Sequence, residues 1–339
     1  MLALPIQTLG EQPKEFLRKY HIEVAACTSS VVSTTTAFPL DSIKTRMQTY
    51  RYPSVAECAR QTYKSEKLRG FFRGVAAPVM SVTVVRTCSF SVYTRAKKFY
   101  SSLFEKAFNY NVLDHVARPG AYPNPYTIAC FGASGATAGA LVSFMACPFE
   151  LTKLSAQVSV LLAAKAGQTG DSEKKRLAES YKNKGTFQTM AHILRNRGPL
   201  GLYTGFNLHL VRDTIGTGVY FMVYESGKQI TSSIFGSNPD NNKLSVAVAG
   251  GLCGVLSWAV IYPVDSVKSI YQRNSLTSLR GEKVPPAPRV QFFKRNMYRG
   301  LGVSITRSAV VNAVFFTFFE GIKKDISKGL SQDEVRKLG

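Results

Sequence analysis

The sequence has few acidic residues and few histidines. Its 339 residues include 43 Lys and Arg but only 21 Asp and Glu and four His, a formal net charge of +22. No nucleophile with a nearby base and no metal-ligand spacing stands out, so we expect no enzyme, no catalytic residue, no metal and no cofactor. The basic excess suits an anionic surface, either nucleic acid or lipid headgroups. Helix-turn-helix, RNP and Cys/His-finger patterns are also missing, which disfavours nucleic acid.

Cysteine pairs and targeting patterns are absent as well. The six cysteines follow no CxxC spacing, so we expect small, buried and reduced side chains. Residues 1–14 lack an apolar run and are not rich in arginine, so they predict neither a secretory signal nor a presequence. Any membrane address is therefore expected in the body of the chain.

Strongly apolar runs are missing, although 45% of the residues are hydrophobic. The mean hydropathy is −0.03. Six segments of modest hydropathy nevertheless have helical length, at residues 22–50, 71–103, 126–157, 202–234, 244–272 and 298–326. Such segments favour membrane helices with one face toward lipid and one toward a polar cavity. Residues 54–67 are amphipathic and predict a short surface helix.

One polar pattern recurs three times. Pro39-Leu-Asp-Ser-Ile-Lys44 returns as Pro148-Phe-Glu-Leu-Thr-Lys153 and Pro263-Val-Asp-Ser-Val-Lys268, at intervals of 109 and 115 residues, each with a glutamine four residues after the lysine. We therefore predict three repeats of two helices. The expected divisions are an N-terminal segment at 1–20, repeats at 21–104, 126–234 and 243–328, linkers at 105–125 and 235–242, a flexible basic insertion at 165–184, and a tail at 329–339.

Six spans place both termini on one side of a membrane. The connections on the other side, at residues 51–73, 158–199 and 273–299, hold 21 basic and 6 acidic residues, which is the bias that orients membrane proteins. Small residues also stand at equal offsets before the three prolines, which predicts close helix packing. They are Ala26 and Ser30, Gly135 and Gly139, and Gly250 and Gly254.

The repeated motif predicts a ring of ion pairs. Each proline is expected to kink its helix, and each acid lies three residues before its lysine, on the same helix face. If three helix ends converge, each acid meets the lysine of another repeat. The expected pairs are Asp41 with Lys153, Glu150 with Lys268, and Asp265 with Lys44. Weak, partly hydrated pairs suit a gate that substrate binding opens, whereas solvated helix ends are the alternative.

These motifs resemble those of the mitochondrial carrier family over residues 20–328. The resemblance implies an all-α membrane protein with six transmembrane helices in three pseudo-symmetric repeats, short matrix-side helices and a central cavity. It further implies alternating access, a multi-pass location in the mitochondrial inner membrane, and a monomer. The ring becomes the matrix gate, and Gln48, Gln157 and Gln272 become braces beneath its pairs.

The family's aromatic-basic-glycine element opens the even-numbered helices and implies bound cardiolipin. It reads Phe72-Arg73-Gly74 and Tyr298-Arg299-Gly300, whereas the middle copy, Tyr203-Thr204-Gly205, has lost its basic residue. Backbone N–H groups at helix N-termini favour such anions. The first repeat also has Glu66-Lys67 where the family usually has an acid and then glycine.

The resemblance places a cytoplasmic gate at the far ends of the same helices. Two copies are intact, Glu225 with Lys228 and Glu320 with Lys323, but the first has Thr94 before Lys97 in place of an acid. By the family's cyclic pairing Lys323 then lacks its acid, so we expect a weaker gate on that side.

Substrate contacts in the family lie seven residues after each helix-opening glycine. That offset gives Ser81, Arg212 and Arg307, and Asp213 follows directly. Buried arginines and an aspartate are costly without a ligand or mutual pairing, so they are either functional or a structural pair between helices. Arg86 either adds affinity for an anion or pairs with a gate residue.

The Arg212-Asp213 pair with Arg307 resembles carriers of carnitine, acylcarnitine and amino acids. A guanidinium can hold a carboxylate while Asp213 faces a positive nitrogen, so we expect a zwitterion. Carriers of ornithine-like dications use an extra acid on the second helix, and neither Ser81 nor its vicinity supplies one.

The expected substrate is thus a zwitterion with one positive nitrogen. The histidine that acylcarnitine carriers have before the first motif proline is Phe38 here. A nucleotide or another small anion is the alternative substrate, although the Gly-aliphatic pair that would hold adenine at 212–213 is absent. An alternative function that is not transport is that of a basic protein that binds membranes or nucleic acid.

Overall fold

The computed structural model describes residues 11–118, 120–166, 172–181, 184–235, 243–278, 282 and 284–337. The described chain folds entirely into helices and connections. The six long helices are α1 (Glu11–Thr49), α3 (Ala76–Phe108), α5 (Pro125–Ala166), α8 (Phe206–Phe235), α9 (Lys243–Thr277) and α10 (Leu301–Lys337). The shorter elements are α2 (Val55–Phe72), α4 (Val112–Ala117), α6 (Ser172–Tyr181), α7 (Thr186–Arg197), η2 (Pro199–Tyr203) and η3 (Arg295–Tyr298).

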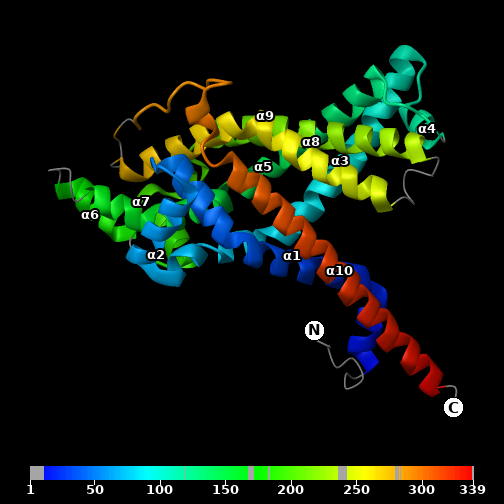
Figure 1. Ribbon diagram of the computed structural model, residues 1–339, viewed down its shortest axis with the longest axis horizontal. Helices are drawn as coiled ribbons and strands as arrows, with labels where there is room; N and C mark the ends of the chain where they lie inside the picture. Colours follow the sequence, from blue (N-terminus) through cyan, green and yellow to red (C-terminus); the bar gives the residue numbers. More distant parts are fainter. Residues whose placement is uncertain are drawn as a thin grey trace.

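The long helices form a closed circuit of neighbours. α5 packs against α3 and α8, α9 packs against α8 and α10, and α1 packs against α10 and α3. At one end, called the convergent end below, they meet beside α2, α6 and α7 (Figure 1). From there they diverge into two arms. One arm contains α1 and α10, and the other contains α3, α5, α8 and α9 (Figure 1). The basic connections thus gather at the convergent end, as the alternation of spans and loops predicts.

Each motif proline lies inside one long helix. Pro39 is within α1, Pro148 within α5 and Pro263 within α9. In all three the helix continues beyond the motif, so the acid, the lysine and the glutamine of each repeat share one helix. The side chains that follow the prolines consequently project from three helices at the convergent end.

Close helix contact at small residues occurs between α5 and α8. A Cβ added at Gly139 would stand 2.2 Å from the Asp213 carbonyl oxygen, and one at Gly135 would stand 2.6 Å from that of Thr217. Only glycine permits this approach, as the equal offsets predict for the second repeat. The third repeat differs, because a Cβ at Gly254 would meet nothing within 4 Å. The surroundings of Gly250 lie outside the described part of the chain.

The main hydrophobic cluster also lies at the convergent end. It joins the ends of α1, α5 and α9 to α2, α6 and α7, with Ile43, Leu151, Leu162, Ile193 and Leu276 among its buried members. Packing of this kind fixes the three motif-bearing helix ends relative to one another.

Two expected loops are partly helical, which corrects the sequence analysis. The insertion predicted at 165–184 contains α6, whose Ala178 and Tyr181 are buried in the main cluster because they recur on one face of the helix. The linker predicted at 105–125 contains α4, where the Asn111 side chain caps the helix by accepting from the N–H groups of Leu113 and Asp114. Residues 167–171, 182–183 and the linker 235–242 beyond Phe235 lie outside the described residues.

Helix α2 of the first repeat contains a residue with a strained backbone conformation. Lys67 interrupts α2 with φ 56° and ψ −156°, a region that is essentially restricted to glycine. This is the position where the family usually has glycine. The strained conformation therefore explains that preference.

Replacing Lys67 by glycine is expected to stabilise the protein. Relief of the strain should raise the free energy of unfolding by about 1–2 kcal/mol, seen as a higher melting temperature in detergent. The control is Lys64→Gly, an exposed position in the regular part of the same helix, which should lower stability by about 1 kcal/mol. Equal losses in the two variants would contradict the strain at Lys67.

By length and composition alone, two described helices could cross a membrane. They are Pro125–Lys165 and Arg295–Phe319, and a bent pair, Val55–Val82 with Val84–Phe108, could form a third span. Charged motif residues lower the hydropathy of α1, α8 and α9. Those charges face the interior of the helix circuit, described below, and not lipid.

No disulfide joins any of the six cysteines within the described residues. Four are buried, namely Cys58, Cys130, Cys147 and Cys253, while Cys27 and Cys88 are half-buried. Burial raises the pKa of the Cys58 thiol to about 11, which keeps it protonated and unreactive. The expectation of reduced packing residues agrees with this arrangement, except that two of them are only half covered.

Candidate functional site

Three ion pairs form a ring at the convergent end. Lys153 Nζ lies 2.6 Å from Asp41 Oδ2, Lys268 Nζ 2.7 Å from Glu150 Oε2, and Lys44 Nζ 2.7 Å from Asp265 Oδ2. Each acid is joined to the lysine of the repeat that the motif spacing predicts. The ring closes the space between α1, α5 and α9, and its members line one small cavity.

One of the three glutamines supports the ring. Gln48 Nε2 donates to Asp265 Oδ2 at 2.9 Å, and its Oε1 accepts from Ser269 at 3.2 Å. Gln272 instead donates to the Thr204 carbonyl, and the amide of buried Gln157 has no partner within the described residues. Within the described residues, Gln48 is therefore the one glutamine that bonds a ring acid. Gln157 and Gln272 line the same small cavity as the ring, and their role as braces stays a prediction.

Arg212 enters the ring from α8. Its Nε lies 3.1 Å from Asp265 Oδ1 and its Nη2 3.7 Å from Glu150 Oε2, and Nη1 also binds Asp213. A single guanidinium thus bridges two ring acids and its own neighbour. A planar group with five donors is suited to such a contact.

Arg307 enters the ring from α10. Its Nε lies 2.5 Å from Asp41 Oδ1, while Lys153 holds the other oxygen of the same carboxylate. Two of the three arginines predicted to contact substrate, Arg212 and Arg307, therefore bind ring acids. Arg212, Asp213 and Arg307 therefore form one connected charge network with the predicted matrix gate.

Two cavities lie on the side of the ring that faces the divergent arms. The first, the α8–α9 cavity, has about 340 Å³ and contains Arg212, Asp213, Tyr220, Phe221 and Trp258 in its lining. The second, the α3–α10 cavity, has about 200 Å³ and contains Ser81, Arg86, Arg307 and Glu150. All five residues predicted to contact substrate line one of the two cavities.

Arg86 contacts no ring acid. Its Nη1 donates to Ser30 Oγ at 3.1 Å, and its guanidinium carbon lies 5.7 Å from the centre of the Phe315 ring. Within the described residues, Arg86 therefore makes no ion pair with a gate acid. Its charge remains available to an anion in the α3–α10 cavity.

The sequence analysis missed Trp258 and His209. Trp258 lines the α8–α9 cavity, and Lys44 Nζ lies 4.0 Å above its ring. Buried His209 has Nε2 3.3 Å from Asp213 Oδ2, one helical turn away. As the single Trp in the chain, Trp258 has no counterpart at repeat spacing, whereas His209 could have been found by its i, i+4 relation to Asp213.

A second set of contacts lies toward the divergent arms. Lys97 Nζ lies 3.2 Å from Glu225 Oε1, and the Tyr93 hydroxyl donates to the same oxygen at 3.0 Å. Lys228 Nζ lies 5.6 Å from the centre of the Tyr224 ring. The side chains of Glu320 and Lys323 lie outside the described residues. Lys97 with Glu225 is therefore the one far-end ion pair between predicted gate residues in the described part of the chain.

Three glycines before the even-numbered helices adopt the left-handed region. Gly74, Gly205 and Gly300 have φ of 87°, 78° and 88°. A Cβ on each would come within 3.2 Å of an atom on a motif helix, which is α5 for Gly74 and α9 for Gly205 and Gly300. Glycine is needed for both reasons.

The basic residues beside these glycines differ in their surroundings. Arg73 is largely buried, with Nε 3.3 Å from Glu66 Oε2 and Nη1 donating to Ser159 at 3.2 Å. Arg299 is exposed, and its carbonyl accepts from the Tyr262 hydroxyl at 2.7 Å. Arg299 is therefore the more accessible of the two to an anion.

Comparison with known proteins decides the family. A family model described as mitochondrial carrier protein matches residues 20–103, 124–234 and 240–329. The chain belongs to the mitochondrial carrier family. The predicted all-helical carrier fold with three repeats is thereby confirmed. Members of this family are transporters, so the chain is a mitochondrial carrier of small metabolites.

The chain is similar to carriers of different metabolites. It is 34% identical over 297 residues to mitochondrial ornithine transporter 1 of Schizosaccharomyces pombe, covering 87% of this chain and 89% of the relative. It is 28% identical over 291 residues to mitochondrial ornithine transporter 1 of Saccharomyces cerevisiae, covering 84% and 88%. It is 28% identical over 297 residues to a mitochondrial carnitine/acylcarnitine carrier-like protein of Arabidopsis thaliana, covering 83% and 90%.

An acid at position 94 is expected to strengthen the far-end contacts of this carrier. Thr94 is half-buried, and its hydroxyl donates only to the Phe90 carbonyl of its own helix. Thr94→Asp should favour the state closed at that end by about 0.5–1 kcal/mol, a two- to fivefold shift in inhibitor preference. Exposed Ser91→Asp on the same helix is the control. Unchanged inhibitor preference and transport kinetics in Thr94→Asp would contradict the expectation.

Proposed function

We propose that this carrier exchanges a small zwitterion, an amino acid or a carnitine-type compound, across the mitochondrial inner membrane as a multi-pass monomer. The observation that carries the proposal is that Arg212 and Arg307 each bind acids of the ring. A substrate that engages either arginine must therefore alter the contacts that close the convergent end. The relatives named for ornithine and for carnitine/acylcarnitine support this substrate class.

The α3–α10 cavity suits the substrate carboxylate. Arg307 and Arg86 both line it, beside the hydroxyl of Ser81. A guanidinium binds a carboxylate with two parallel hydrogen bonds, and partial burial strengthens the contact. A substrate carboxylate would compete with Asp41 for Arg307.

The α8–α9 cavity suits the positive nitrogen. Asp213 supplies a carboxylate there, and the rings of Trp258, Tyr220 and Phe221 line the same space. Aromatic faces attract ammonium and quaternary nitrogen alike, so this cavity fits both an amino acid and a carnitine-type compound. Ser143 Oγ donates to Asp213 Oδ2 at 3.3 Å and helps to fix its orientation.

The charge balance of the site favours a carboxylate. Six cations, Lys44, Lys153, Lys268, Arg86, Arg212 and Arg307, face four carboxylates, Asp41, Glu150, Asp265 and Asp213. An anionic group offsets part of this excess, whereas a substrate of double positive charge adds to it. A small carboxylate anion without a nitrogen is therefore the second candidate, and the rings around Asp213 favour the zwitterion.

Gating follows from competition for the arginines. When the substrate binds Arg307 and Asp213, the ring loses contacts with Asp41 and, through Arg212, with Asp265. Four of the six residues in the lysine pairs are buried, contrary to the partly hydrated pairs expected from the sequence. Much of the attraction in a buried pair is offset by the cost of desolvating its charges, so binding energy of a few kcal/mol could open the pairs that remain. Asp41, Lys44, Glu150, Lys153, Asp265 and Lys268 thus act as the matrix gate, and Lys97 with Glu225, together with Lys228, Glu320 and Lys323, as the cytoplasmic gate.

Bound cardiolipin is part of the proposal. The glycine turns at Gly74, Gly205 and Gly300 leave helix N–H groups that suit lipid phosphates. Exposed Arg299 adds a positive charge to one of these sites, whereas Arg73 is already engaged by Glu66.

Exchange in liposomes tests the substrate class. Liposomes that contain the purified carrier are loaded with carnitine, a neutral amino acid, ornithine or a dicarboxylate. Each compound is also tested as its methyl ester, and as its N-acetyl derivative where one exists. We expect a zwitterion to exchange, and we expect the exchange rate of each blocked form to be at least tenfold lower, because each block removes a charged contact. Exchange that tolerates loss of the nitrogen would favour the anion carrier. Absence of flux for every compound, with salt-sensitive polyanion binding, would contradict transport.

A further inference from the structure

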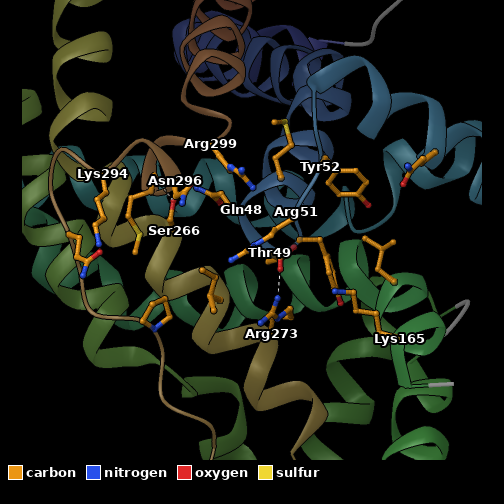
Figure 2. A pocket seen from close by; sticks show the side chains of 18 residues that line it. Gln48, Thr49, Arg51, Tyr52, Lys165, Ser266, Arg273, Lys294, Asn296 and Arg299 are labelled. Atoms are coloured by element: carbon orange, nitrogen blue, oxygen red, sulfur yellow. Dashed lines mark hydrogen bonds between the residues drawn. The ribbon is translucent and has the colours of Figure 1, made fainter. Parts of the chain in front are cut away.

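A large cavity lies on the other side of the ring from the substrate site. This cavity, called the vestibule below, has about 690 Å³. Gln48 and Thr49 of α1 line it, with Lys165 of α5 and Arg273 of α9 (Figure 2). Tyr50, which directly follows α1, also lines it. Residues 288–299 complete the wall. The vestibule therefore contacts all three motif helices just beyond their ring residues.

The vestibule is lined by cations alone among charged residues. Arg51, Lys165, Arg273, Lys294 and Arg299 surround it, and its described lining contains no Asp or Glu (Figure 2). Within the described chain, no ion pair joins Arg51, Arg273, Lys294 or Arg299 to a carboxylate. Like charges around one space repel each other unless an anion enters it.

Arg273 is held in place at the centre of this wall. Its Nη1 donates to the Thr49 carbonyl, its Nε donates to Asn274 Oδ1 at 3.2 Å, and its guanidinium carbon lies 5.4 Å from the centre of the Tyr50 ring. The same Tyr50 ring has Lys165 Nζ at 4.5 Å. Two cations are thus positioned by one aromatic ring before any ligand is bound, which lowers the ordering cost of binding.

We propose that the vestibule binds a phosphate-bearing anion of multiple charge. Phosphate groups accept several charge-assisted hydrogen bonds at once, and arginine and lysine are the side chains that bind them best. Neutral donors from Gln291 and Asn296 line the same space. The ligand is either a free polyphosphate-type compound or the headgroup of a phospholipid, since both offer the same chemistry.

The position of the vestibule couples this anion to the gate. The lining joins the ends of α1, α5 and α9, which must separate when the convergent end opens. An anion bound between them stabilises the closed arrangement, and by linkage it opposes opening by the same factor. The anion should therefore inhibit exchange when present at the convergent side, without competing with substrate.

Binding of inorganic tripolyphosphate to the full-length carrier in detergent tests the proposal. We compare the wild type with Arg273→Gln, Lys294→Gln and Arg60→Gln, whose exposed side chain on α2 is the control. Loss of one charged contact should weaken binding about tenfold in the first two variants and leave the control unchanged. Lys294 is exposed, and its side chain makes no hydrogen bond or ion pair within the described residues, so this variant reports on binding even if Arg273→Gln misfolds.

The source of the phosphate is resolved in lipid nanodiscs. If cardiolipin displaces tripolyphosphate, and Lys294→Gln weakens both, the vestibule holds a lipid headgroup. If tripolyphosphate binds equally with and without cardiolipin, and inhibits exchange, the ligand is a free anion. Wild-type binding in both vestibule variants, or no saturable binding to the wild type, would overturn the proposal. Altered substrate KM without tripolyphosphate binding would also overturn it and leave only electrostatic steering.

Discussion

Replacing Asp41 by asparagine is expected to lower the exchange rate at least a hundredfold. Its buried carboxylate holds Lys153 at 2.6 Å and Arg307 at 2.5 Å, one on each oxygen. Asparagine keeps the size but removes the charge, so two cations lose their shared partner. Breaking a buried pair from one side costs about 3–5 kcal/mol, which is a factor of a hundred or more. Exchange in liposomes and the melting temperature in detergent measure the effect.

A double-mutant cycle separates the pair from its surroundings. Asp41→Asn, Lys153→Gln and the double variant should be non-additive by about 1–3 kcal/mol, because the second change removes a cation that the first left unpaired. Asp114→Asn, at an exposed position in α4, is the control for loss of a carboxylate elsewhere. Additive losses in the cycle would show that the two side chains do not act together.

The ring could be predicted from the sequence because three physical constraints coincide. The proline marks each helix, the spacing of three residues puts acid and lysine on one face, and three copies permit one cyclic arrangement. The same reasoning could not find the contacts of Arg212 and Arg307 with ring acids. Those contacts depend on how far α8 and α10 approach the ring, which periodicity does not determine.

The differences between the sequence-based expectations and the structure have a similar cause. The basic insertion at 165–184 was predicted to be flexible from its composition, yet Tyr181 is fully buried because α6 packs on α5. Gln157 and Gln272 share the offset of Gln48 but lack its contact, since hydrogen bonds of about 3 Å require a precision that pseudo-symmetry does not supply. Repeats therefore predict helices and ring pairs better than they predict side-chain bonds.

The asymmetry of the ring suggests how three similar repeats select one substrate. Asp41 receives Arg307 and Asp265 receives Arg212, while Glu150 has Arg212 only at 3.7 Å. Two ring acids are thus sensitive to what binds the arginines, and the third depends mainly on Lys268. A substrate that engages both arginines weakens the ring at two points, whereas one that engages a single arginine weakens it less.

Arg307→Ala is expected to reduce exchange of a zwitterion by a hundredfold or more and to abolish the preference for a free carboxylate. Arg307 lines the cavity assigned to the carboxylate and is 26% exposed, so a substrate can reach it. Loss of a bidentate, partly desolvated pair is worth about 3 kcal/mol, which corresponds to this factor.

The carboxylate methyl ester makes that prediction specific. In the wild type the free zwitterion should exchange much faster than its ester, whereas in Arg307→Ala the two should exchange at similar low rates, because the group that distinguishes them is gone. Arg95→Ala, exposed on α3, should retain the wild-type preference and shows that loss of an arginine alone is not the cause. A preference that survives in Arg307→Ala would move the carboxylate contact to Arg86 or Arg212. Arg307 would then act on the gate through Asp41, and its loss would slow every substrate by the same factor.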